Sequence, residues 1–184
     1  MRKAKPNGFT LPEVIMVLTF IGIVASIAFW TVDVSDMRLD AASREMGFTL
    51  LAAQNKAVLR QYDVVVRFDT QHGRLRVMED VDGDGVFEPD EPVSEWHVPE
   101  GVEFGRGSVP ELPFGASAVT FRERDGNPEL VFHRNGSASQ WGGIYLRTIR
   151  PGREGRERVR AIEVDRGTGR LTWWRHTPRG WERL

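Results

Sequence analysis

The chain has 184 residues, 40% hydrophobic and 28% charged, which suffices for one packed domain and an accessory element. It contains no cysteine, which excludes a disulfide framework and any thiolate metal site. The formal net charge is −1, but residues 147–184 hold 11 arginines and five acidic residues, whereas residues 9–146 hold 11 basic and 21 acidic residues. This asymmetry indicates either a polyanion-binding C-terminal region or two surfaces that attract each other.

The N-terminus combines a basic flank with a long apolar segment. Residues 1–8 contain three basic and no acidic residues, and residues 14–32 contain no charged residue. A helix over the second range would be about 28 Å long at 1.5 Å per residue, close to the hydrocarbon thickness of a bilayer. A core helix would be amphipathic, and a secretory signal would be shorter and end in an Ala-x-Ala-like site. We therefore expect a single-pass anchor whose basic end is cytoplasmic.

Glu13 stands at the entrance of this apolar segment, where an unpaired carboxylate is costly. The string GFTLPE over residues 8–13 resembles the type III signal of prepilins and pseudopilins. The resemblance implies that a prepilin peptidase/methyltransferase cuts between Gly8 and Phe9 and methylates the new N-terminal Phe9. It also implies that Glu13 neutralises the N-terminal amine of a neighbouring subunit in a filament. Pro12 departs from the commoner aliphatic residue, but a first helical turn tolerates proline.

After a polar interruption at residues 33–36, the pattern becomes amphipathic. Apolar residues recur at spacings of three and four, which predicts a helix. They are Leu39, Ala42, Met46, Leu50, Ala53 and Ala57. We expect one helix over about 10–60, with its first half in lipid and its second half packed on a domain. The predicted organisation is a leader at 1–8, a transmembrane and polymerisation helix at 9–36, and a soluble domain at 37–184.

The soluble domain divides into a helical half at 37–60 and a β domain at 61–184. Short β-rich runs separated by turn signals predict strands. The candidates are 62–69, 74–79, 93–98, 118–122, 129–133, 143–149, 158–164 and 171–174. Residues 105–117 are rich in glycine and proline and predict a loop. The expected fold class is α+β, a helix packed on an antiparallel β-sandwich or open barrel.

The second half of the chain adds a further resemblance. The strings VFHRNGSAS (131–139), GGIYL (142–146), RAIEV (160–164) and GTGR (167–170) resemble the C-terminal half of GspH/FimT-type minor pilins. Together with the N-terminal string, they imply a type IV pilin-like fold. The Arg-rich hairpin at 150–158 and the Trp-rich tail depart from the family pattern.

The resemblance implies a structural protein and not an enzyme. The function expected first is that of a minor pseudopilin in the type II secretion pseudopilus, and the alternative is a minor pilin of a type IV pilus. Both imply a protein of the bacterial inner membrane with its C-terminal domain periplasmic or extracytoplasmic. The implied partners are other pilins or pseudopilins, the prepilin peptidase/methyltransferase, an inner-membrane assembly platform and membrane lipid.

An acidic segment, DVDGDGVFEPDE, fits the twelve-residue calcium loop pattern over residues 80–91. The Ca²⁺ ligands would be Asp80, Asp82, Asp84, the Val86 carbonyl, Glu88 and bidentate Glu91. Such a site would suit a membrane-tethered, calcium-dependent binding module. The flanking runs predict strands and not the helix pair of an EF-hand, and acidic Asp/Gly loops also form plain turns. Both interpretations stay open, and we favour the solvated turn.

Arginine and tryptophan alternate in the C-terminal tail. Arg170, Arg175 and Arg179 could neutralise phosphates while neighbouring indoles stack on bases. Some FimT-like pilins are thought to act in DNA uptake through a basic C-terminal surface, so the resemblance permits DNA as a partner. The interpretation that we favour is structural: one of Trp173 and Trp174 faces the core, and the arginines of the region pair with acidic residues. The acids expected in these pairs are Glu154, Glu157 and Glu163.

No motif for enzymatic chemistry stands out. The four histidines are scattered, without the spacing of a metal site, and the sequence has no nucleophile elbow or phosphate-binding glycine loop. A Ser/His/Asp triad cannot be read from sequence spacing, because its members come from distant parts of a chain. We expect His97 and His133 to be exposed polar residues on strands.

Overall fold

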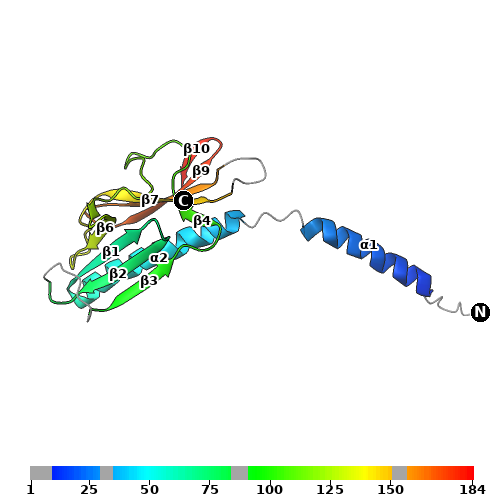
Figure 1. Ribbon diagram of the computed structural model, residues 1–184, viewed down its shortest axis with the longest axis horizontal. Helices are drawn as coiled ribbons and strands as arrows, with labels where there is room; N and C mark the ends of the chain where they lie inside the picture. The colour runs from blue at the N-terminus through cyan, green and yellow to red at the C-terminus, as the bar shows by residue number, and fades with distance from the viewer. Residues whose placement is uncertain (1–9, 30–34, 84–90, 151–156) are drawn as a thin grey trace, which may run out of the picture. The chain divides into compact units, whose positions relative to one another are not determined.

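The structure is a computed structural model that describes residues 10–29, 35–83, 91–150 and 157–184. The chain divides into two compact units, one up to Val34 and one from Ser35 to Leu184 (Figure 1). The first unit contains helix α1 (Leu11–Phe29) and the second begins with helix α2 (Ser35–Arg60). A continuous helix over residues 10–60 is therefore not shown, and residues 30–34 lie outside the described residues.

The two helices differ in how they expose apolar side chains. The apolar side chains described in α1 are exposed, among them Leu11, Met16 and Phe20. No helix within the described ranges has the length and apolar character that a membrane span requires. In α2 the predicted inward stripe is confirmed, because all six of its apolar residues are buried. The helix ends at Arg60, and the next residue, Gln61, has the positive φ of 62° that is common after a last helical residue.

In the part of the second unit that the structure describes, ten strands follow and form two antiparallel five-stranded sheets. The first sheet has the order β3-β2-β1-β6-β5 and the second has the order β10-β9-β8-β7-β4. The strands are β1 (Asp63–Asp69), β2 (Arg74–Asp80), β3 (Val93–His97), β4 (Val102–Phe104), β5 (Glu123–Arg124), β6 (Asn127–Phe132), β7 (Gly142–Thr148), β8 (Val159–Val164), β9 (Leu171–Thr177) and β10 (Gly180–Arg183). The predicted α+β class with antiparallel sheets is confirmed.

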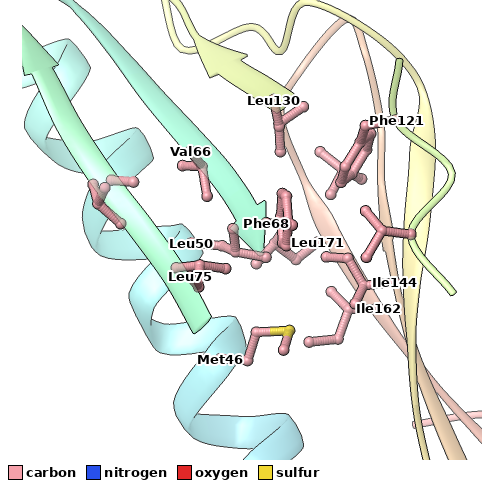
Figure 2. Packing of buried hydrophobic residues seen from close by; sticks show 14 of the residues in the cluster. Met46, Leu50, Val66, Phe68, Leu75, Phe121, Leu130, Ile144, Ile162 and Leu171 are labelled. Carbon is pink, nitrogen blue, oxygen red and sulfur yellow. The ribbon is translucent and has the colours of Figure 1, made fainter. Parts of the chain in front are cut away.

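The main core lies between the two sheets and α2. Met46 and Leu50 of α2 meet Phe68 of the first sheet and Ile144 and Ile162 of the second, as Figure 2 shows. In β1 the alternate side chains point into this core, which is the burial pattern of a strand with one solvated face. The hydrophobic residues whose side chains are described as buried all come from residues 39–171 of the second unit. This unit therefore contains a complete core of its own.

A second, smaller core covers the other face of the second sheet. The segment at 105–117, predicted as a loop, folds over β7 and β8 and packs Phe114 against Tyr145 with ring centroids 5.1 Å apart. The Tyr145 hydroxyl donates to the Gly115 carbonyl at 2.8 Å and accepts from the Leu112 amide at 2.8 Å. The pairing requires a glycine beneath the ring, since a Cβ on Gly143 would come within 2.5 Å of Phe114. The loop is thus a packed layer.

The structure corrects the strand prediction in one place and extends it in three. Residues 118–122 form no strand and contribute only an isolated bridge between Val119 and Ile144. Strands β4, β5 and β10 were not predicted. The first two are only three and two residues long, too short for a periodic pattern.

Candidate functional site

Glu13 caps the first turn of α1. Its Oε2 lies 3.3 Å from both the amide nitrogen and the hydroxyl of Thr10, the residue before the helix. A Thr and a Glu three residues apart at a helix start form a capping box, which satisfies amides that lack helical partners. The predicted cleavage site, Gly8 and Phe9, lies outside the described residues. The carboxylate of Glu13 is exposed and directed toward the N-terminal end of the helix.

The outward face of α2 carries an exposed apolar stripe that the sequence analysis missed. Met37, Phe48 and Leu59 are 68%, 65% and 80% exposed, and Ala41 and Ala52 are exposed between them. These five residues follow one another at spacings of four and seven, so they share one side of the helix. The spacing is present in the sequence, but the inward stripe of the same helix has more apolar residues, and it alone was recognised as a pattern. A row of exposed apolar side chains along one helix face is a candidate surface for association with another protein. We call these five residues the outer stripe.

The structure brings three of the predicted calcium ligands together. One carboxylate oxygen from each of Asp80, Asp82 and Glu91 lies within 4.8 Å of the others. Asp80 is buried and accepts from the Gly83 amide at 2.9 Å, and Glu91 accepts from the Val81 amide at 2.8 Å. These bonds fold the two ends of the loop toward each other. The remaining predicted ligands, Asp84, Val86 and Glu88, lie outside the described residues.

If this loop binds Ca²⁺, the unit comprising residues 35–184 should melt several degrees higher in millimolar calcium than in chelator. A ligand that binds only the folded state stabilises it, by about 2.7 kcal/mol at a hundred times its dissociation constant. Circular dichroism during heating measures the difference, and Asp80→Asn with Glu91→Gln should remove it. Equal melting temperatures with calcium and with chelator would leave the loop as a plain acidic turn.

The three C-terminal arginines of the DNA hypothesis do not converge on one spot. Arg170 precedes β9, Arg175 lies within it, and Arg179 lies in the turn that follows it. Nine residues of nearly extended chain place the first and last of them about 25–30 Å apart. Arg175 is half-buried and stands opposite Arg160 on β8 and Glu182 on β10. The structure thus gives a line of separated charges and not a compact basic patch.

Other arginines of the basic region are paired within the fold. Arg158, just before β8, and Arg160, within it, contact Asp36 of α2 at 2.9 and 3.7 Å, and Arg160 also contacts Asp40 at 2.6 Å. Arg147 contacts Glu157 at 3.5 Å, as predicted. The structural interpretation of the charge asymmetry therefore gains support.

The predicted acidic partners need a correction. Glu163 accepts hydrogen bonds from the indoles of Trp141 and Trp174, both at 3.0 Å, and has no arginine partner in the described part of the chain. The aspartates of α2 take that role, because the helix crosses the second sheet beside Arg158 and Arg160. Glu154 lies outside the described residues.

The tryptophans of β9 face opposite sides of the second sheet, as the structural interpretation predicts. Trp173 packs on the main core and Trp174 on the smaller one. Trp173 also fits closely against α2, where a Cβ on Gly47 would come within 2.6 Å of the indole. Both rings are therefore committed to packing, which leaves them unsuited to stacking on bases.

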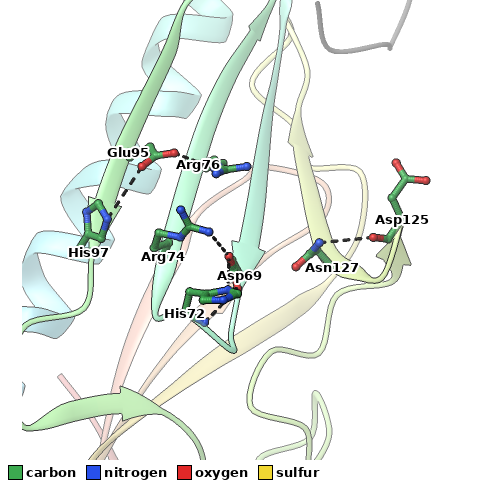
Figure 3. Close-up of polar contacts among 8 residues, drawn as sticks. All are labelled: Asp69, His72, Arg74, Arg76, Glu95, His97, Asp125 and Asn127. Atoms are coloured by element: carbon green, nitrogen blue, oxygen red, sulfur yellow. Dashed lines mark hydrogen bonds and ion pairs between the residues drawn. The ribbon is translucent and has the colours of Figure 1, made fainter.

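The solvated face of the first sheet carries a row of ion pairs (Figure 3). Asp69 contacts Arg74 at 2.7 Å and His72 at 2.8 Å, and Arg76 contacts Glu95 at 2.8 Å. Burial alone would raise the pKa of Asp69, but hydrogen bonds from Arg74 and His72 outweigh it and lower the pKa to about 2.

The histidines have structural partners. His97 is exposed on β3, as predicted, whereas His133 lies just after β6, half-buried, and its Nδ1 is 2.7 Å from Asp63. His176 packs edge-on against Trp181, and burial lowers the pKa of its imidazole. Within the described ranges no histidine is hydrogen-bonded to a serine or threonine hydroxyl, so no Ser–His or Thr–His pair is formed there.

Comparisons with known proteins give a distant structural similarity and no sequence match. No protein family and no curated protein matches the sequence. Two structures of the minor pseudopilin EpsH from the type II secretion system of Vibrio cholerae are similar to this chain, with 14% and 16% sequence identity. They cover 80% and 83% of this chain and 96% of their own chains, each with a TM-score of 0.38. Function therefore has to be inferred from the residues of this chain.

Proposed function

We propose that this protein is a structural subunit of a pilin-like filament, a minor pseudopilin that takes part in type II secretion. The observation that carries the proposal is the outer stripe of α2. A helix face with three large apolar side chains in water is costly for a protein that stays alone, because each would gain about 1.5–3 kcal/mol on burial. Packing against helices of other subunits would bury it.

The N-terminal residues complete the assembly mechanism. The apolar segment at residues 14–32, which continues in the sequence beyond α1, holds the unassembled subunit in the bacterial inner membrane as a single-pass anchor, with the second unit periplasmic. A prepilin peptidase/methyltransferase removes residues 1–8, and a membrane assembly platform moves the mature chain into the filament. Glu13 already points its carboxylate at the start of its own helix. In the filament it would pair with the N-terminal amine of a neighbouring Phe9.

The internal arginine pairs favour the secretion pseudopilus over a DNA-binding type IV pilus. Arg147 is paired with Glu157, Arg158 with Asp36 and Arg160 with Asp40. These ion pairs reduce the positive charge that is available to a polyanion. The separation of Arg170 from Arg179 along β9 has the same consequence, because strong phosphate binding sums many close contacts.

Phe48→Glu should prevent assembly while leaving the domain folded. Phe48 is 65% exposed, so the charge costs little in the free subunit, but it would have to be buried in a helix–helix contact. Since the chain has no cysteine, a single Leu59→Cys reports contacts between copies, or with a cysteine-bearing pseudopilin, as disulfide-linked species. The linked fraction in membranes should fall at least tenfold in the Phe48→Glu variant.

Val93→Glu is the matched control, since it places the same charge on an exposed apolar residue of the edge strand β3. It should crosslink like the natural sequence. Glu13→Gln should lower crosslinking without changing the melting temperature of residues 35–184. Full crosslinking of the Phe48→Glu variant would show that the outer stripe is not an assembly surface.

A further inference from the structure

A pocket of about 510 Å³ opens where three loop segments meet. It lies beside residues 118–122, residues 138–141 and the turn that joins β8 to β9. Its lining residues are Thr120, Arg122, Ser139, Gln140, Trp141 and Arg166. The volume is in the range that accommodates a small molecule or a few residues of a peptide. No residue of the outer stripe or the acidic loop, and none of the three arginines of the DNA hypothesis, lines this pocket.

The walls of the pocket are fixed by hydrogen bonds to the backbone. The Gln140 side chain accepts from the Arg122 amide at 2.9 Å and donates to the Glu129 carbonyl at 2.7 Å. The Ser139 hydroxyl accepts from the Val131 amide at 3.0 Å, and the Thr120 hydroxyl accepts from the Gly143 amide at 2.8 Å. The uncharged polar side chains of the wall thus hold its shape and have little capacity left for a ligand.

Two cations and one aromatic ring remain available. Arg122 and Arg166 are exposed, and neither forms an ion pair with any of the described residues. Trp141 is 47% exposed, yet its ring is held by the hydrogen bond to Glu163 and by an edge contact with Phe114 at 6.5 Å between centroids. A guanidinium binds a carboxylate through two parallel hydrogen bonds, and a rigid indole offers a flat apolar surface.

We propose that this pocket binds an acidic peptide segment of a partner protein. A carboxylate side chain of the segment pairs with Arg122 and Arg166, and a neighbouring flat side chain, aromatic or proline, lies on Trp141. A discrete carboxylate fits better than a nucleic acid strand. Glu123 and Asp165 are exposed next to the two arginines in the chain, and they would repel a ligand that carries a phosphate at every nucleotide.

Calorimetric titration of the full-length protein in a nonionic detergent tests the proposal. The probes are the unlabelled peptide GFEPEFG, its uncharged counterpart GFQPQFG and the oligonucleotide (dT)12, each at low salt. We expect the acidic peptide to bind at least tenfold more tightly than the uncharged one. Arg122→Gln, Arg166→Gln and Trp141→Ala should each weaken acidic-peptide binding about tenfold, the size expected for one lost charge-assisted contact or aromatic contact.

Arg179→Gln is the matched control, because it removes an exposed arginine at the far end of β9 and should leave the affinity unchanged. The arginine variants should keep the melting temperature of the natural chain, since their side chains lie at the surface, and circular dichroism checks that Trp141→Ala remains folded. Equal binding of the two peptides would overturn the proposal. So would (dT)12 binding that is tighter than peptide binding and is lost in the Arg122 and Arg166 variants.

Discussion

Gly8→Arg should leave the protein at its full length in the membrane, whereas the natural chain should lose residues 1–8 and carry a methyl group on Phe9. A residue without Cβ lets a protease approach the backbone closely, and an arginine at that position obstructs the approach. Intact-mass spectrometry of protein extracted from membranes of its own host measures both products. We expect complete loss of cleavage in the variant, and with it loss of every Leu59→Cys crosslink.

Asn7→Arg provides the control, because it adds the same side chain one residue earlier and keeps Gly8. It should be cleaved and methylated like the natural sequence. A mature natural chain that begins near Ser26 would instead identify an ordinary secretory signal. In that event the prepilin interpretation of residues 8–13 would be wrong, and Glu13 would be absent from the mature protein.

The sequence predicts the core of the second unit well because periodic burial leaves a periodic pattern. The inward residues of α2 recur every three or four positions, and Leu39, Met46 and Leu50 are completely buried. In β1 the buried residues Val64, Val66 and Phe68 alternate with half-buried neighbours that are polar except for Val65, which marks a strand with one solvated face. The position of such a residue in the periodic pattern indicates that it is buried, so a single sequence is enough to identify it.

Short strands are not predicted from the sequence because they form only by pairing with a neighbouring strand. Strand β4 has three residues and exists as an edge pair of β7, with Val102 opposite Thr148. Residues 118–122 look more strand-like, yet Phe121 and Val119 enter the core from a segment that makes only one bridge. Apolar side chains alone therefore do not show whether a partner strand is in register.

Pairs between distant elements are equally hidden from the sequence. The acids nearest to Arg160 in the chain were the natural candidates for its partner, but the partner is Asp40, 120 residues earlier. The pocket around Trp141 could not be predicted from the sequence either, because Arg122 and Arg166 are far apart in the chain and both line the pocket only in the folded protein. The ends of the acidic loop were predictable as a cluster because their carboxylates are close in the chain.

Asp40→Ala should destabilise residues 35–184 by about 3 kcal/mol, because it removes the close partner of the buried Arg160 guanidinium and leaves only the longer contact with Asp36 at 3.7 Å. Arg160 has only 6% of its side chain exposed, and its Nε donates to Asp40 at 2.6 Å. The pair joins α2 to β8, so its loss also loosens the helix from the second sheet. Urea unfolding measures the free energy, and the melting temperature should fall by about 6–12 °C.

Two further variants distinguish the free-energy cost of leaving a charge buried without a close partner from the cost of losing an ion pair. Arg76→Ala removes an exposed pair with Glu95 on the solvated face of the first sheet, and it should cost no more than about 1 kcal/mol (Figure 3). Asp40→Leu combined with Arg160→Met replaces the pair by apolar side chains and leaves no charge without a partner. It should therefore recover most of the stability that Asp40→Ala loses. If Asp40→Ala costs no more than Arg76→Ala, water reaches Arg160 in solution, and the pair does not fasten α2 to the second sheet.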